Sequence, residues 1–187
     1  QGLVLSEGAL WERQRERIQP AFYMDRIARY ADTMTAAVRA AAADWDDGVV
    51  VDIEDEMKAL TLRILVNSIF GSDIDYDERG IRETVERLQE PGQPAKQPIA
   101  RMVPKWAPIP MWRRYRQGIE EMEAVIEAVV ESKRSETGEN DDLVSMLMAA
   151  TDAEGEGMSE TLLRDELMTF LFAGHETTAT ALTFGWY

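Results

Sequence analysis

The stretch LMTFLFAGHETTAT, from residue 167 to residue 180, combines side chains that rarely share one apolar helix. Its first half, from Leu167 to Ala173, is apolar around nearly the whole circumference of a helix, which predicts deep burial. A glycine, a histidine, a glutamate and two threonines follow at 174–178, where packing alone would favour more leucine. Because such a break in a buried pattern is typical of function, this stretch is the first candidate site.

The residues at 174–178 could deliver protons to a flat bound partner. Gly174 lacks a side chain and would leave a groove on the helix, and Glu176 supplies an ionisable carboxyl group. Thr177 follows Ala173 by one turn, so its hydroxyl can compete for that carbonyl and loosen the helix. The structural alternative is that the threonines only bond back to carbonyls four residues earlier and that Glu176 pairs with a distant arginine.

A second candidate pair, Trp11 and Arg15, lies in the polar segment LWERQRERIQPAF. The two residues are four apart, so they share one face of a short helix that breaks at Pro20. One interpretation is a tryptophan packed on the domain with an arginine snorkelling beside it. The other is a pair that donates an indole N–H and a guanidinium to one anionic group. The spacing does not distinguish between them.

Metal chemistry is poorly supported by the sequence. A zinc-protease interpretation of His175 and Glu176 requires a second histidine at position 179, which is Ala179, and His175 is the only histidine in the chain. A calcium loop from Asp152 would need a carboxylate at its twelfth position, which is Leu163. For His175 we therefore expect a supporting hydrogen bond or simple packing.

The elements that carry these residues are predicted to be mainly helical. A β-branched run at 49–51 allows at most one short strand, and six prolines between residues 91 and 110 predict mostly loop. We find no internal repeat and no domain linker. Helical periodicity and capping residues predict, after the first short helix, segments at about 25–45, 53–70, 81–90, 111–136 and 143–150, and a last helix that opens at Ser159.

Composition excludes several classes of function. The 35 acidic and 20 basic residues give a formal net charge of −15, which argues against binding to nucleic acid. Only four of the cationic residues are lysines, and an acidic, lysine-poor surface suggests the hypothesis of a halophilic source. The absence of cysteine fits a protein inside the cell, and no apolar run approaches the roughly 20 residues of a membrane-spanning helix.

The two candidate motifs together resemble the cytochrome P450 family. AGHETT at 173–178 is similar to the family's oxygen-activation motif, Ala/Gly-Gly-x-acid-Thr-Thr, at all six positions. Trp11 and Arg15, followed by PAF at 20–22, resemble the family's Trp-x-x-x-Arg helix, whose side chains bind a haem propionate. The segments PKWAPIPMWRRYR and DDLVSMLMAA also resemble family sequence, so the resemblance covers essentially the whole chain.

The resemblance implies a mainly α, partial cytochrome P450 fold, with residues 1–187 as a single incomplete domain that is truncated at both ends. We expect a fragment because the chain opens on Gln1 and stops at Tyr187 within an apolar helical run. The family's iron-ligating cysteine is absent from this sequence, so no metal ligand is assigned. By itself the chain is not expected to bind haem properly or to catalyse a reaction.

The site residues that the resemblance implies fall into three groups. Thr177 would relay a hydrogen bond to dioxygen, and Glu176 would feed the proton network, as the catalytic residues. Phe172 and Ala173 would border the substrate. The residues implied in cofactor binding are Trp11 and Arg15 at a haem propionate, with Ala173, Gly174, Thr177 and Thr178 along the haem edge.

The implied activity is a monooxygenase that inserts one atom of O2 into a small apolar substrate. It would use haem b, with electrons from NAD(P)H through a ferredoxin- or flavoprotein-type reductase as partner. We expect a cytoplasmic protein of a prokaryote, without nucleic-acid or membrane binding. The alternative function is a non-catalytic, all-α module that binds a lipid-like ligand with its apolar helix and proline-rich loop.

Overall fold

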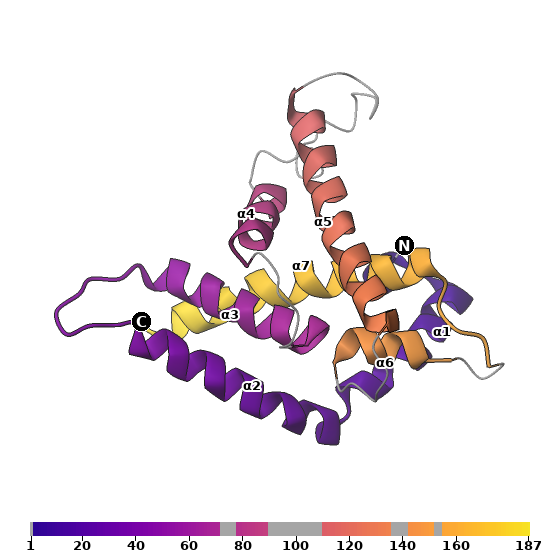
Figure 1. Ribbon diagram of the computed structural model, residues 1–187, viewed down its shortest axis with the longest axis horizontal. Coiled ribbons are helices and arrows are strands. Elements are labelled where there is room, and N and C mark those ends of the chain that lie inside the picture. Colours follow the sequence, from indigo (N-terminus) through magenta and orange to yellow (C-terminus); the bar gives the residue numbers. More distant parts are fainter. Residues whose placement is uncertain (1, 72–77, 90–109, 136–141, 152–154) are drawn as a thin grey trace. The chain divides into compact units, whose positions relative to one another are not determined.

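The protein is described by a computed structural model, which covers residues 2–71, 78–89, 110–135, 142–151 and 155–187 (Figure 1). The prediction of a mainly α fold is confirmed. The predicted proline-rich loop lies almost entirely outside the described residues. In chain order the helices are η1 (Leu3–Leu5), α1 (Gly8–Ile18), η2 (Gln19–Phe22), α2 (Met24–Ala43), α3 (Ile53–Phe70), α4 (Glu78–Gln89), α5 (Pro110–Ser135), α6 (Leu143–Ala149) and α7 (Glu160–Gly185).

The short strand that was allowed for at 49–51 does not form. Val49, Val50 and Val51 are all exposed, and Val50 retains 97% of its accessible surface. A β-branched run forms a strand only where a neighbouring strand satisfies its backbone groups and its side chains find cover. Within the described ranges the only β-type pairing is an isolated antiparallel bridge between Thr151 and Gly157.

Capping residues explain where the central helices begin and end. Asp52 Oδ1 accepts hydrogen bonds from the backbone N–H groups of Glu54 at 3.0 Å and Asp55 at 3.3 Å, so α3 begins as predicted. Gly71 ends α3 at φ 88°, a conformation that suits glycine. Asp142 caps α6 and Ser159 caps α7 in the same way. These local signals fix the ends of the helices on which the site depends.

The chain divides into two compact units. One comprises residues Gln1–Ile74 and Val129–Tyr187, and the other comprises Asp75–Ala128. In the second unit, α4 and the first part of α5 contact each other, with Leu88 against Gly118 and Arg87 in an ion pair with Glu121 at 2.8 Å. All predicted site residues belong to the first unit.

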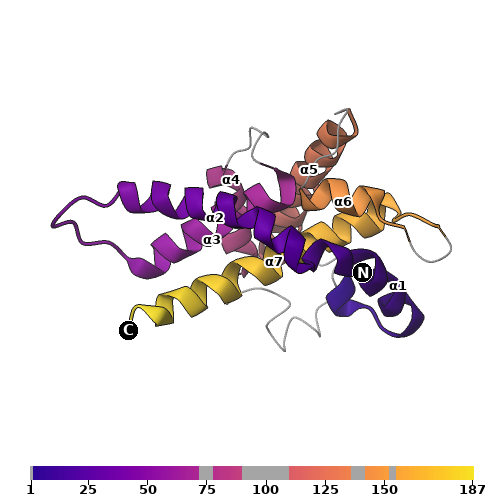
Figure 2. The same ribbon diagram turned by 90° about the horizontal axis from the view of Figure 1, so that it is seen from below.

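In the first unit, α3 lies between α2 and α7, and the three helices run side by side (Figures 1 and 2). Ala37 of α2, Met57 and Leu60 of α3, and Ala179 of α7 form one buried cluster. At the end of this layer the rings of Trp45 and Trp186 meet edge to face, with centroids 6.0 Å apart. The packing of α3 on α7 thus determines which face of α7 remains open.

Candidate functional site

The helix α7 has one buried face and one exposed face, and the candidate motif lies across both. Its buried residues recur every three or four positions, which is the spacing of one helical face. Ala173, Glu176 and Thr177 are exposed, as are Thr178 and Thr180. The buried residues are Leu163, Glu166, Leu167, Leu171, His175 and Ala179.

The hydroxyl of Thr177 is bonded within the helix. Thr177 Oγ1 donates a hydrogen bond to the carbonyl oxygen of Ala173 at 2.6 Å. The sequence predicted this bond, because Ala173 lies one turn before Thr177. The bond does not interrupt α7, which is continuous from Glu160 to Gly185. The hydroxyl proton is therefore directed at the Ala173 carbonyl, and the oxygen of this exposed side chain can still accept a hydrogen bond.

Gly174 does not leave an open groove on α7, and that expectation is wrong. A Cβ atom at position 174 would lie 2.9 Å from Cδ1 and 3.2 Å from Cδ2 of Leu65. The side chain of Leu65, from α3, therefore occupies the space that the missing side chain provides. The glycine permits close packing of α3 on α7. Its assignment to the haem edge stays a prediction.

His175 is 1% exposed and lies on the buried face of α7, away from Glu176 and Thr177. Its backbone carbonyl accepts a hydrogen bond from Thr61 Oγ1 of α3 at 3.4 Å. The burial agrees with the packing that was expected for this residue. Phe172 is half-buried, and the structure does not test its assignment to the substrate.

The structure brings Trp11 and Arg15 together on α1. The guanidinium carbon of Arg15 lies 5.1 Å from the ring centroid of Trp11, which is within cation–π range. Trp11 is 37% exposed and Arg15 is exposed. Among the residues that the structure describes, no carboxylate pairs with Arg15. An accessible guanidinium beside an indole can accept an external anion.

Glu166 was not singled out by the sequence interpretation, although it is fully buried. Its Oε2 accepts a hydrogen bond from the backbone N–H of Leu3 at 2.9 Å. Burial raises the pKa of this carboxyl above its ordinary value. Its position in the sequence could have indicated this burial, because residue 166 lies on the same face of the helix as the apolar residues Leu163 and Phe170. A carboxylate on an apolar stripe requires a partner.

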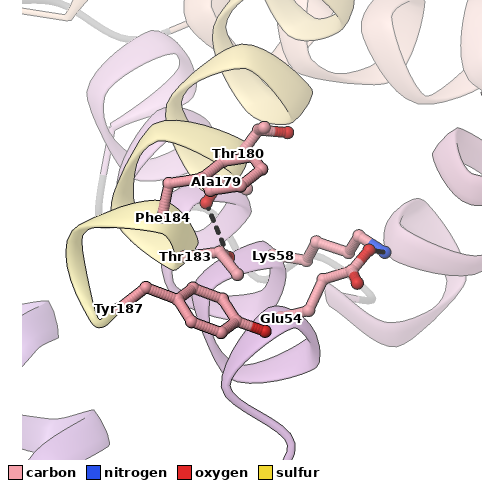
Figure 3. Close-up of a pocket in the computed structure, with 7 residues that line it drawn as sticks. All are labelled: Glu54, Lys58, Ala179, Thr180, Thr183, Phe184 and Tyr187. Atoms are coloured by element: carbon pink, nitrogen blue, oxygen red, sulfur yellow. Dashed lines mark hydrogen bonds and ion pairs between the residues drawn. The ribbon is translucent and has the colours of Figure 1, made fainter.

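A pocket of about 460 Å³ opens beside the C-terminal half of α7 (Figure 3). Thr183 Oγ1 donates to the carbonyl oxygen of Ala179 at 2.9 Å on one wall, and the Glu54–Lys58 ion pair forms another. None of the predicted site residues lines this pocket. Its lining residues are Glu54, Lys58, Ala179, Thr180, Thr183, Phe184 and Tyr187.

The described residues offer neither a metal site nor a membrane span. No group of three or more His, Cys, Asp or Glu side chains in the described ranges could hold a metal ion. No helix in these ranges combines the length and the apolar character needed to cross a bilayer.

Comparison with known sequences identifies the family. The sequence model described as "Cytochrome P450" matches residues 1–187, and the chain therefore belongs to the cytochrome P450 family. It is 33% identical over 201 residues to "Cyclooctatin synthase" of Streptomyces melanosporofaciens, covering 100% of this chain and 41% of that protein. It is 27% identical to "Pentalenene oxygenase" of Streptomyces avermitilis, covering 97% of this chain and 40% of that protein.

Solved structures share the fold. "Retinoic acid bound cyanobacterial CYP120A1" superposes with a TM-score of 0.81 at 19% identity, covering 97% of this chain and 40% of that one. "Crystal structure of cytochrome P450DA heme domain" gives a TM-score of 0.77 at 26% identity, covering 95% and 40%. The partial cytochrome P450 fold is thus confirmed. The chain spans about 40% of the length of the relatives it matches.

The residues present fit one side of a haem, the cofactor that the family implies. Arg15 and Trp11 offer an accessible cation and an indole N–H, which suit a propionate carboxylate. Ala173 and Thr177 present a small side chain and a hydroxyl on the exposed face of α7. The thiolate ligand is not among these residues because the chain contains no cysteine.

Proposed function

We propose that the protein containing this chain is a cytochrome P450 monooxygenase that inserts one atom of O2 into an apolar organic substrate. The observation that carries the proposal is that Ala173, Glu176 and Thr177 lie on the exposed face of α7, a helix whose opposite face is buried and packs against α3. A carboxyl group and a hydroxyl group, here those of Glu176 and Thr177, are expected on the exposed face of such a helix where protons must reach a bound ligand.

The residues of this chain have separate roles in the proposal. Bound haem would supply the centre at which dioxygen is reduced. Arg15 and Trp11 bind and orient a propionate through charge-assisted and indole hydrogen bonds. Glu176, exposed and ionisable, takes protons from solvent and passes them along the α7 face. Thr177 holds a proton at Oγ1 and can turn it outward from the Ala173 carbonyl. Thr178, the next residue, lies along the haem edge in the proposal.

The proposed substrate is small and largely apolar, and Phe172 and Ala173 border it. The names of two relatives, "Pentalenene oxygenase" and "Cyclooctat-9-en-7-ol 5-monooxygenase", denote an alkene and an alkenol as compounds acted on by those proteins. Electrons come from NAD(P)H through a ferredoxin- or flavoprotein-type reductase. A cytoplasmic location in a bacterium belongs to the same proposal, since these relatives come from Streptomyces.

The proposal is tested with Thr177→Ala in the haem-loaded, full-length protein. The variant removes the hydroxyl, and positioned proton transfer contributes roughly 10²–10⁴-fold in rate, so product formed per O2 consumed should fall about tenfold or more. Thr177→Ser, which keeps the hydroxyl, is the matched control. Oxygen uptake, NAD(P)H oxidation and product are measured together.

Two outcomes would contradict the proposal. Unchanged coupling in Thr177→Ala would remove the role of the hydroxyl. A protein that binds apolar ligands but gives no thiolate-type Soret band in its reduced carbon monoxide complex would instead support the non-catalytic binding module.

A further inference from the structure

We propose that Glu166 is a positioning residue that fixes the start of α1, and with it the Trp11–Arg15 pair, to the helix that carries Thr177. The proposal deepens the proposed function and rests on it for the role of Trp11 and Arg15. The contact itself joins residues that are 163 positions apart in the sequence.

Leu3 is the centre of the hydrogen bonds that connect α7 to α1. Its N–H donates to Glu166 Oε2 at 2.9 Å, and its carbonyl accepts from the Ser6 hydroxyl at 3.0 Å and from the Ser6 N–H at 3.4 Å. Ser6 is 7% exposed and directly precedes Glu7, the N-cap residue of α1. The short helix η1 contacts both α1 and α7. A shift at Leu3 is therefore passed to the first turn of α1.

Gly2, which precedes Leu3, packs closely against α7. A Cβ atom at Gly2 would overlap the Thr169 hydroxyl and lie 2.8 Å from the carbonyl oxygen of Asp165. Thr169 Oγ1 in turn donates to that carbonyl at 2.7 Å. The backbone at Gly2 and Leu3 thus packs directly on the turn of α7 that contains Asp165, Glu166 and Thr169.

The other end of α1 reaches the same part of α7. The helix α1 ends at Ile18, which is 2% exposed, and η2 continues to Phe22. The rings of Phe22 and Phe170 lie with their centroids 5.5 Å apart. Residues 165–170 of α7 therefore contact the chain both before and after α1. We call this part of α7 the α1 clamp.

The α1 clamp and Thr177 share one continuous helix. Thr177 follows Glu166 by eleven positions, which corresponds to about 16 Å along the axis at roughly 1.5 Å per residue. Trp11 and Arg15 lie on α1, between the two contacts of the clamp. The clamp thereby sets the distance between the groups that would bind the propionate and the hydroxyl that would relay protons.

The test uses the haem-loaded, full-length protein with Glu166→Leu and Glu166→Gln. Leucine removes the acceptor for the Leu3 N–H, whereas glutamine retains one. Glu160→Gln is the matched control, because Glu160 lies on the same helix with 79% of its side chain exposed. Amide hydrogen exchange of residues 2–6 is measured, together with the rate of haem transfer to an apo-globin acceptor.

In Glu166→Leu, exchange at Leu3 should rise about tenfold or more, as expected when an N–H group loses its hydrogen-bond acceptor, and haem transfer should accelerate severalfold. Glu166→Gln and Glu160→Gln should resemble the unchanged protein. If Glu166→Leu does not fold, Gly2→Ala must give the same faster exchange and haem transfer, since it displaces the segment without removing the carboxyl.

Unchanged exchange at Leu3 or unchanged haem transfer, in Glu166→Leu or in Gly2→Ala, would overturn the proposal. The Arg15→Ala variant distinguishes a failure of the clamp proposal from a failure of the proposed propionate-binding role. If Arg15→Ala leaves haem transfer unchanged, the propionate role of Arg15 is wrong, whereas the Leu3 exchange data still report on the clamp itself.

Discussion

At the scale of single residues, Gly174 combines two opposing effects on stability. Alanine is favoured over glycine in a helix interior by about 1 kcal/mol. The new methyl group would, however, press on Leu65 Cδ1, 2.9 Å away, and overpacking costs typically about 1–3 kcal/mol. Gly174→Ala should therefore be neutral to destabilising, by about 0–2 kcal/mol, in denaturant unfolding of the full-length protein.

Repeating Gly174→Ala in a protein that also carries Leu65→Ala tests whether contact with Leu65 opposes the substitution. In a Leu65→Ala variant the clash is removed, so adding Gly174→Ala should increase the free energy of unfolding by about 1 kcal/mol. If Gly174→Ala has the same effect in both backgrounds, contact with Leu65 does not explain the glycine.

Glu166 predicts a pH dependence of stability. Burial raises the pKa of its carboxyl, the nearby Asp165 raises it further, and the Leu3 N–H opposes both. A raised pKa in the folded state means that the contribution to stability is complete below the unfolded-state pKa, near 4.5, and is lost as pH rises through the folded-state value. The free energy of unfolding of the unchanged protein, minus that of Glu166→Gln, should therefore fall with increasing pH above about 4.5.

Unfolding curves for both proteins between about pH 4.5 and pH 8 measure this difference. A difference that grows with pH would show that the folded protein prefers the ionised carboxylate.

Residue chemistry was predictable where it depends on local spacing and not where it depends on tertiary contacts. Four-residue spacing was sufficient to pair Trp11 with Arg15 and Thr177 with the Ala173 carbonyl. The partners of Gly174 and Glu166 come from distant parts of the sequence, Leu65 and Leu3, and no local pattern encodes them.

At the scale of elements, capping residues predicted the helix ends, whereas the apolar stripe of α2 did not predict which of its residues are buried. Helix α3 begins after Asp52 and ends before Gly71, as predicted, because both residues act on their own helix. In α2, by contrast, the apolar stripe includes Ile27 at 41% and Val38 at 48% exposure. Helix α2 contacts α3 through the face that carries Ala37, and periodicity alone does not decide which face a neighbour covers.

A buried ion pair joins the end of α5 to the start of α6. Lys133 Nζ lies 3.1 Å from Asp142 Oδ2, with both side chains about 5% exposed or less. Asp142 also caps α6 by accepting hydrogen bonds from the Ser145 N–H at 2.8 Å and hydroxyl at 3.0 Å. Lys133→Met would leave the carboxylate buried without its cation, so we expect a loss of about 3 kcal/mol in denaturant unfolding.

The control is the exposed pair of Lys58 with Glu54, whose side chains are 31% and 62% exposed. Lys58→Met should change stability by no more than about 0.5 kcal/mol, since surface pairs contribute little. The double variant Lys133→Met with Asp142→Asn, which retains a capping oxygen, should recover part of the loss. Equal effects of Lys133→Met and Lys58→Met would contradict the importance of burial.

At the scale of the whole molecule, the formal net charge of −15 on these 187 residues suggests a test of the hypothesis of a halophilic source. Raising KCl from about 0.1 M to 1 M shortens the Debye length from about 10 Å to 3 Å and weakens repulsion among surface carboxylates. We expect the melting temperature to rise by about 2–4 °C, equivalent to about 1 kcal/mol. Sucrose, which favours burial without screening charge, is the control. A melting temperature independent of KCl would count against adaptation to salt.

The contact between Leu3 and Glu166 also has a consequence for biosynthesis. About 150 residues are translated between Arg15 and Glu166, and at roughly 5–20 residues per second this takes about 8–30 s. During that interval the nascent chain already contains Trp11 and Arg15 but lacks the part of α7 that is proposed to fix α1. A haem encountered by the emerging chain would meet a pair of side chains that is not yet anchored. Under the proposed clamp, cofactor capture through this pair would follow the synthesis of α7.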